Sequence, residues 1–495
     1  MYVEKTTSLR HQRDAYEFSK DLQVYALFWE QGVGKTKPTI DKFGHLYLSG
    51  KVQGLFVVAP SNVAPNWVND ELPKHMPDSL LSQACVHLYQ SSKAKQKRNL
   101  QARQELLKAK GPAVLVMSFD AIRTKLGKAY ARRFMLKFQC FGVVDESQRI
   151  KKPSGKTAVT VVTAGRYLPY KTVLSGTPVT NGILDLYMQV RFLDENFWEK
   201  RGLEPFSVFK KHFAIMRTRA EALEEDGWDP GYDQVLGYKN IEEMAGYIKL
   251  IGHRLTKDSA GIKLPPKVYT KRYFDLTPEQ MRMYVELEED LITHFPRINE
   301  EDEEKLVEVL DQLTLGTRHA QITCGYMPPE AGEPVIMIGD RNPRLECFKE
   351  AVKDLDGKSI VWCRFNTDVD LVMRTLVDMG RKPVRYDGQV SIDEREENKR
   401  AFQEGDATDF VAKQSAASAG VTLHAAKFVH YYSQSYNWEH RAQSEDRAHR
   451  IGLQHSVLYI DYIANGTIDG KILRALRKNH KFAQQVLGDT PTEWI

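Results

Sequence analysis

The segment Glu30–Thr36 combines glycines, a lysine and a threonine in an order suited to phosphate binding. It consists of Glu-Gln-Gly-Val-Gly-Lys-Thr and follows the apolar run Val24–Phe28, which predicts a short buried strand. In a strand–turn–helix unit, glycines let backbone N–H groups surround phosphate oxygens, and the helix N-terminus adds a favourable field. Lys35 would then contact the β- and γ-phosphates of a nucleotide, and Thr36 would coordinate Mg²⁺. Because Trp29 replaces the first glycine of the full motif, a turn that binds no ligand is the alternative.

Two acidic residues after a second apolar run could supply the metal and water chemistry. Asp145 and Glu146 follow Phe141–Val144, which predicts another buried strand. Asp145 could hold Mg²⁺ through water or Thr36, and Glu146 could orient and deprotonate an attacking water. The pair could instead form a helix N-cap and an acidic first turn. The upstream Lys35 favours the catalytic interpretation.

Two arginines near the C-terminus could stabilise the charge that develops during phosphoryl transfer. Arg447 and Arg450 are three residues apart, so on a helix they would share one face, next to Gln443. They could reach a γ-phosphate bound by another part of the molecule, and hydrolysis would then drive movement between the parts. The alternative is a surface helix in which Glu445, Asp446 and the arginines form ion pairs.

These candidate residues lie at the ends of apolar runs that alternate with helix-prone segments. The runs expected as strands are residues 24–28, 55–59, 113–117, 141–144, 172–174, 359–363, 384–386, 410–412 and 428–432. Such alternation predicts an α/β fold, and ligands bind at the carboxyl ends of its parallel strands. We expect lobe 1 over residues 1–195, a helical insert and linker over 196–344, lobe 2 over 345–480 and a tail over 481–495.

Two segments of the predicted insert have distinct compositions. Leu264–Lys267 is a rigid Leu-Pro-Pro-Lys break that could act as a hinge or crossover. The acidic segment Asn299–Lys305 predicts a solvated helix face or loop.

The composition is that of an ordinary soluble globular protein of two or three domains. The chain has 495 residues, of which 42% are hydrophobic and 27% charged. Neither a membrane span of ~20 apolar residues nor the apolar core of a signal peptide is found. The five cysteines are scattered without a C-x-x-C pair, which argues against a disulfide framework and a structural zinc site. A reducing interior is expected.

The net charge of +5 is mild, so nucleic-acid binding would require a local basic face. The Lys- and Arg-rich segment Lys93–Lys110 is better explained as a solvated surface helix than as a phosphate-contacting face. A second Gly-Lys-Thr, in Ser154–Thr157, follows a polar stretch rather than a strand. With Lys151 and Lys152 it is interpreted as a basic loop near nucleic acid.

Taken together, the motifs resemble those of the SWI/SNF-type ATPases of helicase superfamily two over nearly the whole chain. The matching segments are Gln12, Gly32–Thr36, Ala59–Ser61, Asn66–Trp67, Asp145–Lys151, Leu174–Pro178, Asn181, Leu264–Lys267, Asp387–Gly388, Ala419–Leu423 and Gln443–Gly452. The last of these, with Ala464–Asp469, looks most like the branch that contains the annealing helicases.

The resemblance implies two RecA-like lobes and an ATP-driven translocase on double-stranded DNA, which uses ATP and Mg²⁺. It implies that Gln12 contacts adenine, that Ser175 and Thr177 couple the ATP site to movement, and that Arg447 and Arg450 are arginine fingers. The other implied nucleotide-binding residues are Gly32, Val33, Gly34, Gly420 and Gln443, and the implied DNA contacts are Ser61, Asn62, Lys151, Lys152 and Asn181.

Departures from the family pattern shape the functional expectation. The usual Asp-Glu-Ala-His is Asp-Glu-Ser-Gln here, so Gln148 must form any hydrogen bond to the third motif that histidine normally forms. Hydrolysis should survive because both acids are intact, although coupling could change. The short insert and the lack of chromo-, bromo- or SANT-like segments fit a monomeric bacterial or viral motor in the cytoplasm better than a nucleosome remodeller.

Three alternatives stay open. One is a strand-separating, branch-migrating or fork-remodelling helicase, and another is the motor subunit of a larger restriction, defence or repair complex. The third is a nucleotide-gated binding protein that has lost hydrolysis, against which the intact acids and arginines argue.

Overall fold

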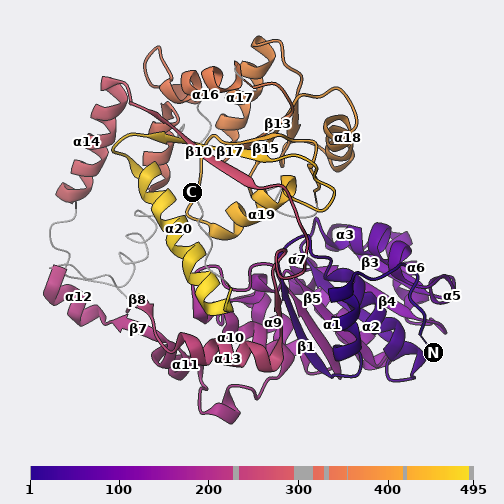
Figure 1. The fold of residues 1–495 in the computed structure, drawn as a ribbon. Helices are drawn as coiled ribbons and strands as arrows, with labels where there is room; N and C mark the ends of the chain where they lie inside the picture. Colours follow the sequence, from indigo (N-terminus) through magenta and orange to yellow (C-terminus); the bar gives the residue numbers. More distant parts are fainter. Residues whose placement is uncertain are drawn as a thin grey trace. The chain divides into compact units, whose positions relative to one another are not determined.

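The computed structural model describes residues 2–226, 233–294, 316–327, 334–353, 355–415 and 421–489. Two compact units, which we call lobe 1 and lobe 2, make up the fold (Figure 1). Lobe 1 comprises Met1–Met216, Val235–Lys263 and Lys481–Pro491, and lobe 2 comprises Arg217–Gln234 and Leu264–His480. The two lobes therefore share the predicted insert, and the break at Leu264–Lys267 begins where the second lobe resumes.

Lobe 1 is built on a seven-stranded sheet with the order β3-β4-β2-β5-β6-β1-β9, in which all neighbouring strands are parallel. Its strands are β1 (Val24–Trp29), β2 (Gly54–Ala59), β3 (Cys85–Tyr89), β4 (Ala113–Ser118), β5 (Cys140–Asp145), β6 (Tyr170–Leu174) and β9 (Gly252–Leu255). The five predicted strands are confirmed. The apolar pattern missed the edge strands β3 and β9, which carry polar residues such as His87, His253 and Arg254.

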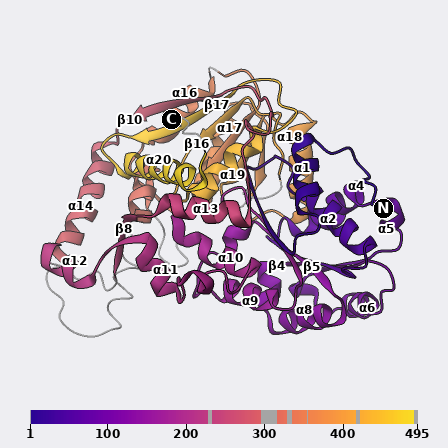
Figure 2. The same cartoon turned by 60° about the horizontal axis from the view of Figure 1, so that its bottom comes forward.

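Helices cover both faces of this sheet, so its strands are apolar on both sides. Leu55 and Val57 of β2 belong to one core cluster, and Phe56 and Val58 belong to the other. The first cluster is covered by α1 (Arg10–Ser19), α2 (Thr36–Leu48), α3 (Ala64–Asn66), α4 (Leu72–His75) and α5 (Asp78–Leu81). The second is covered by α6 (Lys97–Leu106), α7 (Phe119–Arg123), α8 (Lys125–Lys137), α9 (Lys156–Gly165), α10 (Leu186–Leu193), α11 (Phe206–Phe213) and α13 (Ile241–Ile251). Figure 2 shows β4 and β5 between α1 and α2 on one side and α8 and α9 on the other.

The C-terminal segment also belongs to lobe 1. Ala483, Val486 and Leu487 are part of its core. Arg254, on β9, forms a two-pronged ion pair with Asp489, with Nε–Oδ1 at 2.9 Å and Nη2–Oδ2 at 2.7 Å. The same guanidinium donates to the carbonyl of Phe28 at 2.9 Å, so the last described residue is tied to the strand that precedes the phosphate-binding candidate.

Lobe 2 has a six-stranded sheet with the order β10-β17-β16-β13-β15-β14, again with parallel neighbours. Its strands are β10 (Lys267–Phe274), β13 (Ser359–Cys363), β14 (Pro383–Tyr386), β15 (Asp409–Lys413), β16 (Phe428–Tyr431) and β17 (Val457–Ala464). Four were predicted, whereas β10 and β17 were not. Two small sheets pair β7 (Ala214–Arg217) with β8 (Gln234–Tyr238) and β11 (Tyr326–Met327) with β12 (Ile336–Met337).

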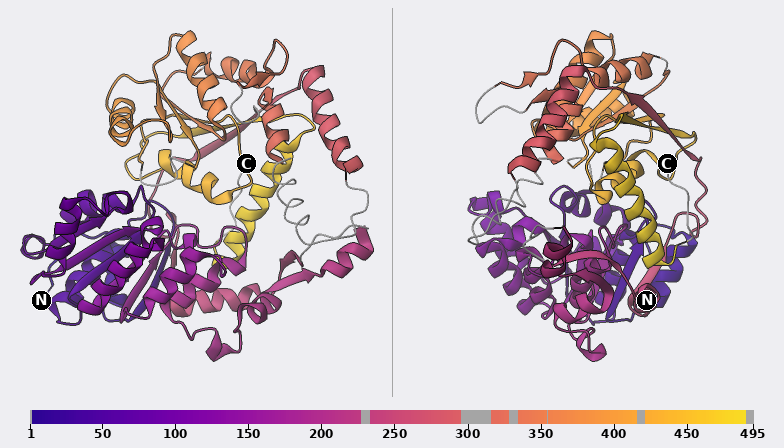
Figure 3. Two further views of the ribbon diagram at one scale, coloured as in Figure 1. Left: turned by 180° about the vertical axis from the view of Figure 1, so that it is seen from behind. Right: turned by 90° about the vertical axis from the view of Figure 1, so that its left-hand side faces the viewer.

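Helices also cover both faces of the second sheet, as Figures 1 and 3 show. One core joins α16 (Pro343–Lys353) and α17 (Asn366–Asp378) to the sheet, and the other joins α18 (Ile392–Gln403) and α19 (Trp438–Ala448). The described part of the chain also contains α12 (Arg219–Asp226), α14 (Pro278–His294) and α20 (Ile468–Leu487). Among the described residues, no helix combines the length and the apolar character needed to cross a membrane.

The predicted helical insert and linker, residues 196–344, also contains β9 and β10, which form edges of the two main sheets. An edge strand needs few apolar residues, and all but the last residue of β10 are partly buried or exposed. The predicted acidic segment Asn299–Lys305 lies outside the described residues.

Candidate ATP site

Three neighbouring strands of lobe 1 bring the candidate residues to one edge of the sheet. The strands β5, β6 and β1 are adjacent, and Leu174 of β6 is aligned with both Asp145 of β5 and Leu27 of β1. The residues that follow these strands therefore emerge side by side at their carboxyl ends. This is the position at which parallel α/β sheets bind ligands.

The loop after β1 has the backbone geometry of a phosphate cradle. Gly32 and Gly34 have φ values of 80° and 83°, a left-handed conformation that side chains disfavour. The Lys35 Nζ donates to the carbonyls of Trp29 and Glu30 at 3.0 and 3.3 Å, so it lies over the loop. Trp29 is fully buried at the end of β1. The position where the full motif has its first glycine is thus still strand, which explains the departure.

Helix α1 holds the loop from one side. The Gln12 Nε2 donates to the carbonyl of Gly34 at 3.0 Å, and its Oε1 accepts from the backbone N–H of Leu9 at 2.9 Å. A Cβ at Gly34 would lie 2.4 Å from Gln12 Nε2, so a side chain there would displace this amide. His11 Nε2 lies 2.9 Å from the carbonyl of Val33. Gln12 is therefore a loop clamp here, and its contact with adenine stays a prediction.

Asp145 and Glu146 adopt a constrained arrangement at the end of β5. Asp145 Oδ2 accepts from the Trp67 indole Nε1 at 2.9 Å, and Oδ1 accepts from the backbone N–H of Glu146 at 3.0 Å. Glu146 has a φ of 53°, a left-handed conformation found at few non-glycine residues and often at functional sites. Burial and the adjacent Glu146 carboxylate raise the pKa of Asp145, while Trp67 and Lys35 oppose the shift.

Gln148 links the acid pair to the residues after β6. Its Nε2 donates to Glu146 Oε2 at 2.7 Å, and its Oε1 accepts from Ser175 Oγ at 2.6 Å. Ser175 Oγ in turn accepts from the backbone N–H of Thr177 at 3.1 Å. The hydrogen bond expected between Gln148 and the third family motif, which is Leu174–Pro178 here, is therefore present, with Ser175 as its donor. The proposed coupling roles of Gln148, Ser175 and Thr177 stay predictions.

The residues of this edge fit ATP and Mg²⁺. Within the described chain, the Gln31 amide and the Thr177 hydroxyl are buried without a hydrogen-bond partner, as expected beside a polar ligand. Thr36 is the first residue of α2, so its hydroxyl and the helix N-terminus lie next to the loop. No cluster of three His, Cys, Asp or Glu residues that could hold a metal occurs among the described residues. Mg²⁺ typically uses one or two protein ligands together with phosphates and water.

The second set of candidates lies on and after α19 of lobe 2. Arg447 is buried, and its Nη1 donates to the carbonyl of Val421 at 3.4 Å. Arg450 Nη1 donates to Thr422 Oγ1 at 2.9 Å. Gln443 Nε2 donates to Glu439 Oε1 at 3.3 Å. Gly420 lies outside the described residues.

Two expectations for this region need correction. One helix does not carry both arginines, because α19 ends at Ala448 and Arg450 follows it. The alternative of an exposed helix laced by ion pairs is also wrong, because Glu445 and Arg447 are only 2% exposed. The apolar pattern could not reveal this burial, since the helix is polar in sequence and its charges are paired inside the lobe.

That pairing forms a buried charge network. Arg441 Nη1 contacts Asp461 Oδ1 at 2.5 Å, and its Nε contacts Glu445 Oε1 at 2.8 Å. Glu445 Oε2 also contacts Lys267 Nζ at 2.9 Å and accepts from Tyr269 at 2.8 Å. The guanidinium of Arg441 lies 3.5 Å from the centroid of the Tyr431 ring. This network joins α19 to β10 and β17.

The predicted DNA contacts fall into two environments. Ser61 and Asn62 are exposed directly after β2. Asn181 and Lys151 both contact Asp185, through the Asn181 N–H at 2.8 Å and the Lys151 Nζ at 3.9 Å, while Lys152 is exposed. Their contact with DNA stays a prediction.

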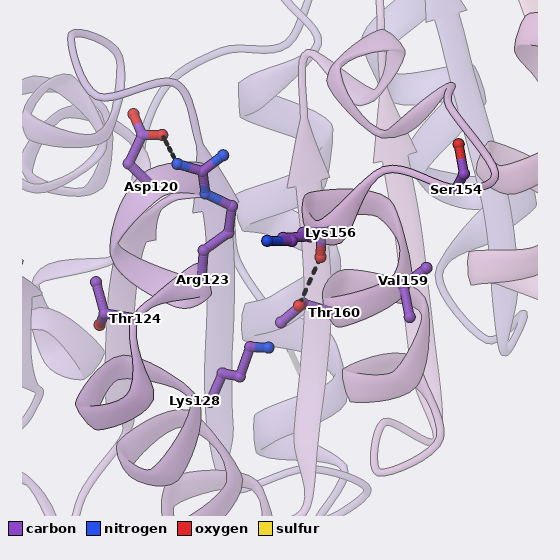
Figure 4. Close-up of a pocket in the computed structure, with 8 residues that line it drawn as sticks. All are labelled: Asp120, Arg123, Thr124, Lys128, Ser154, Lys156, Val159 and Thr160. Atoms are coloured by element: carbon purple, nitrogen blue, oxygen red, sulfur yellow. Dashed lines mark hydrogen bonds and ion pairs between the residues drawn. The ribbon is translucent and has the colours of Figure 1, made fainter. Parts of the chain in front are cut away.

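The second Gly-Lys-Thr segment borders a separate pocket of about 580 Å³. Lys156 is the first residue of α9 and follows a turn, not a strand, which confirms that the segment is no phosphate loop. Figure 4 shows Arg123, Lys128 and Lys156 on the neighbouring elements α7, α8 and α9. Arg123 pairs with Asp120 at 3.4 Å, so the pocket is only partly basic.

Residues that the sequence analysis did not assign to the site include Trp67, His11 and Asp185. Trp67 stands in a quoted motif, but its partner Asp145 is 78 residues away and no local pattern pairs them. His11 adjoins Gln12 and could have been found by its proximity.

Comparisons with known proteins agree with the two-lobe organisation. Residues 20–324 match the family model described as "SNF2-related domain", and residues 343–452 match "Helicase conserved C-terminal domain". The chain is 23% identical over 462 residues to "Uncharacterized ATP-dependent helicase MG018" of Mycoplasma genitalium, which covers 92% of this chain and 40% of that protein.

Eukaryotic proteins match at similar levels. "ISWI chromatin-remodeling complex ATPase CHR17" of Arabidopsis thaliana is 26% identical over 463 residues, covering 91% of this chain and 39% of that protein. The chain thus spans about 40% of the length of these curated relatives. A solved structure, "Sulfolobus solfataricus SWI2/SNF2 ATPase core in complex with dsDNA", is 20% identical, with a TM-score of 0.41 and coverage of 99% of each chain.

Proposed function

Because the chain belongs to the SNF2-related family, we propose that it is a DNA-stimulated ATPase that moves along double-stranded DNA. The observation that carries the proposal is the junction of β1, β5 and β6, where the glycine loop, the acid pair and the Gln148–Ser175 hydrogen bond share one edge. Proteins of this family use ATP with Mg²⁺. Because a bacterial protein is among the relatives, the proposed site of action is the cytoplasm.

The residues of lobe 1 would bind ATP and prepare water for attack. The loop N–H groups and Lys35 would hold the phosphates, while Thr36 and Asp145 would bind the metal. Magnesium would neutralise phosphate charge and orient the γ-phosphoryl group. Glu146 would accept the proton of the attacking water, and its position is fixed by Gln148 Nε2 at 2.7 Å.

The residues of lobe 2 would stabilise the charge that develops on the transferred phosphoryl group. We assign this role, that of arginine fingers, to Arg447 and Arg450. Arg447 donates to the carbonyl of Val421, and Arg450 donates to the hydroxyl of Thr422. Arg441 is held by the buried carboxylates of Asp461 and Glu445, and breaking such buried pairs is costly, so Arg441 is not assigned this role.

DNA would be held through its backbone. Ser61 and Asn62 present polar side chains at the carboxyl edge of the first sheet, and Lys152 adds positive charge. Backbone contacts give affinity without sequence preference and weaken steeply with salt. A cycle of ATP binding and hydrolysis would then be coupled to stepwise movement along the duplex.

The decisive experiment is the ATPase rate on a panel of duplex, single-stranded, forked and four-way DNA at several salt concentrations. The proposal requires the largest stimulation with duplex DNA and a steep loss with salt. A rate that is unchanged by every DNA would overturn it and would favour a nucleotide-gated binding protein.

A strand-separating helicase is the second candidate, because the Mycoplasma genitalium relative is named an ATP-dependent helicase. Triplex displacement and forked-duplex unwinding, measured in parallel, distinguish the two. Displacement without unwinding supports the translocase, and unwinding supports the helicase. A role as the motor of a larger complex fits the greater length of the relatives and would appear as a higher mass of the native complex.

A further inference from the structure

Trp67 connects the acid pair to the exposed turn after β2. It is 1% exposed, and its indole Nε1 donates to Asp145 Oδ2 at 2.9 Å. It begins a π-helical turn, Trp67–Glu71, between α3 and α4, in which the N–H of Leu72 bonds to the Trp67 carbonyl. Single π-turns inside helical segments are frequently found at functional sites.

We propose that Trp67 is a positioning residue that fixes the Asp145 carboxylate and links it to the exposed pair Ser61–Asn62. The proposal rests on the proposed function, because it takes Asp145 as a magnesium ligand and Ser61–Asn62 as a DNA contact.

The first part of the proposal follows from the hydrogen bonds of Asp145. Each carboxylate oxygen has one donor: Trp67 Nε1 for Oδ2, and the Glu146 backbone N–H for Oδ1. The terminal torsion of an aspartate is broad, so a carboxylate held on one side only can rotate. The indole therefore sets the plane in which the remaining lone pairs point. Outer hydrogen bonds of this kind orient metal ligands.

The second part follows from the short, bonded connection between Ser61 and Trp67. The N–H groups of Val63 and Ala64 bond to the Pro60 carbonyl, each at 2.9 Å. Asn66 bonds back to Val63 at 2.9 Å, and Ala64 is buried at 2% exposure. A turn tied down at these points moves as a unit. Displacement of Ser61–Asn62 by a DNA backbone would therefore shift the indole N–H of Trp67.

Trp198 provides a matched control within lobe 1. It is also fully buried, and its Nε1 donates to the carbonyl of Tyr187 at 3.0 Å. Its ring belongs to the core cluster on the other face of the sheet. Trp198→Phe therefore removes a buried indole hydrogen bond of nearly the same length, 3.0 Å against 2.9 Å, that involves no candidate site residue.

The experiment compares Trp67→Phe with Trp198→Phe in the full chain. Replacing Trp67 by β-(3-benzothienyl)alanine adds a variant that keeps the ring shape and removes only the N–H. One measurement is Mn²⁺ affinity of the protein–ADP complex by electron paramagnetic resonance, and the other is the fold-stimulation of ATPase by duplex DNA. We expect both Trp67 variants to bind Mn²⁺ about tenfold more weakly, the lower end for such outer partners. We also expect a loss of at least half of the DNA stimulation, with Trp198→Phe like wild type in both.

Mn²⁺ affinity of the Trp67 variants within twofold of the Trp198→Phe value overturns the proposal. Weaker Mn²⁺ binding with full DNA stimulation overturns the link to Ser61–Asn62. If duplex DNA fails to stimulate the wild-type enzyme, the proposed function is wrong. The Mn²⁺ comparison still tests whether Trp67 positions Asp145 in that case.

Discussion

The pKa values of two buried carboxylates, one in each lobe, are shifted in opposite directions. In lobe 1, burial and the Glu146 carboxylate raise the pKa of Asp145. In lobe 2, burial also disfavours the Glu445 carboxylate, but Lys267 and Arg441 outweigh burial and lower the pKa of Glu445 to about 2. The difference arises because Glu445 contacts cationic groups at 2.9 and 2.8 Å, whereas the hydrogen bonds to Asp145 come from neutral N–H groups.

The buried lysines repeat the contrast. Burial lowers the pKa of Lys42 in lobe 1 to about 7, and its Nζ donates to the Leu22 carbonyl at 2.9 Å. Burial acts in the same direction on Lys267 in lobe 2. There, however, Glu445 and the phenols of Tyr269 and Tyr459 together raise its pKa well above the usual value.

This contrast separates two uses of buried charge. The charges of Arg441, Glu445 and Lys267 in lobe 2 are satisfied by one another and by Asp461, so they hold α19 against the sheet and have little left to offer a ligand. The acids of lobe 1 are held in place by neutral donors, so they retain the capacity to bind a metal or exchange a proton. Removing a member of the paired network in lobe 2 should therefore lower stability, whereas removing an acid of lobe 1 should lower the rate of ATP hydrolysis.

The largest expected effect is on catalysis through lobe 1. Glu146→Gln removes the proposed base, and Lys35→Ala removes the proposed phosphate ligand. Each should lower kcat by about 10²-fold or more, because positioned acid–base and electrostatic groups contribute on this scale. Steady-state ATPase with duplex DNA measures the rate, and thermal unfolding should show little change. Wild-type rates in both variants would mean that the site is assigned wrongly.

The next largest effect is on the stability of lobe 2. Arg441→Ala leaves Asp461 and Glu445 buried with fewer partners, which should cost about 3–5 kcal/mol. Arg341→Ala is the matched control, because Arg341 pairs with Glu346 at 2.6 Å on the exposed surface. That change should cost far less than Arg441→Ala, because solvent screens an exposed ion pair. Chemical denaturation measures both. Equal losses would show that burial does not distinguish the two pairs.

The pH dependence of stability should differ between the lobes. The folded-state pKa of Lys42 lies below its unfolded value, so between pH 7 and 10.5 the unfolded chain binds more protons. The contribution of Lys42 to the free energy of unfolding therefore rises with pH in this window, by up to about 1.4 kcal/mol per pH unit. Lys42→Met should remove this slope, whereas Lys137→Met on the exposed face of α8 should retain it. If the free energy of unfolding has the same pH slope in both variants, the lowered pKa of Lys42 is contradicted.

For Glu445, we expect a change of stability at acid pH instead. Its folded-state pKa lies below the unfolded value of about 4.3. The stability it confers is complete above that value and is lost as the pH falls toward 2. Urea denaturation of wild type and Glu445→Gln between pH 2 and 6 should converge at the acid end. Parallel curves throughout would exclude this contribution.

The smallest effect concerns the hydrogen bond from Ser175 to Gln148. A double-mutant cycle with Ser175→Ala and Gln148→Ala should give a coupling energy of about 1 kcal/mol in DNA-stimulated kcat. The bond from Ser147 to Gln189 has the same length of 2.6 Å and is equally buried, so the corresponding cycle is the control. Loss of the Ser147–Gln189 bond should lower the free energy of unfolding without changing the ratio of the DNA-stimulated to the basal ATPase rate. The same kinetic coupling in both cycles would indicate a purely structural bond.

Much of the fold and the site was predictable because the determining signals are local. Continuous apolar runs identified nine of the parallel strands, and the glycine loop, the acid pair and the Ser175 segment each follow one of them. The family, the two-lobe α/β fold and the use of ATP with Mg²⁺ agree with the matched domains. The edge strands β9 and β10 were missed because edge strands need few apolar residues.

Sequence by itself therefore determined which chemical groups the chain carries and at which strand ends they stand. Only the tertiary structure decided what those groups contact. Trp67 meets Asp145, and Lys267 meets Glu445 across 178 residues, through packing that no local pattern encodes. The charge state of a buried acid depends on such partners within a few ångströms, because Coulomb energies in a low-dielectric interior rise steeply at short distance. That is why one buried carboxylate is suited to binding a metal and another holds a helix in place.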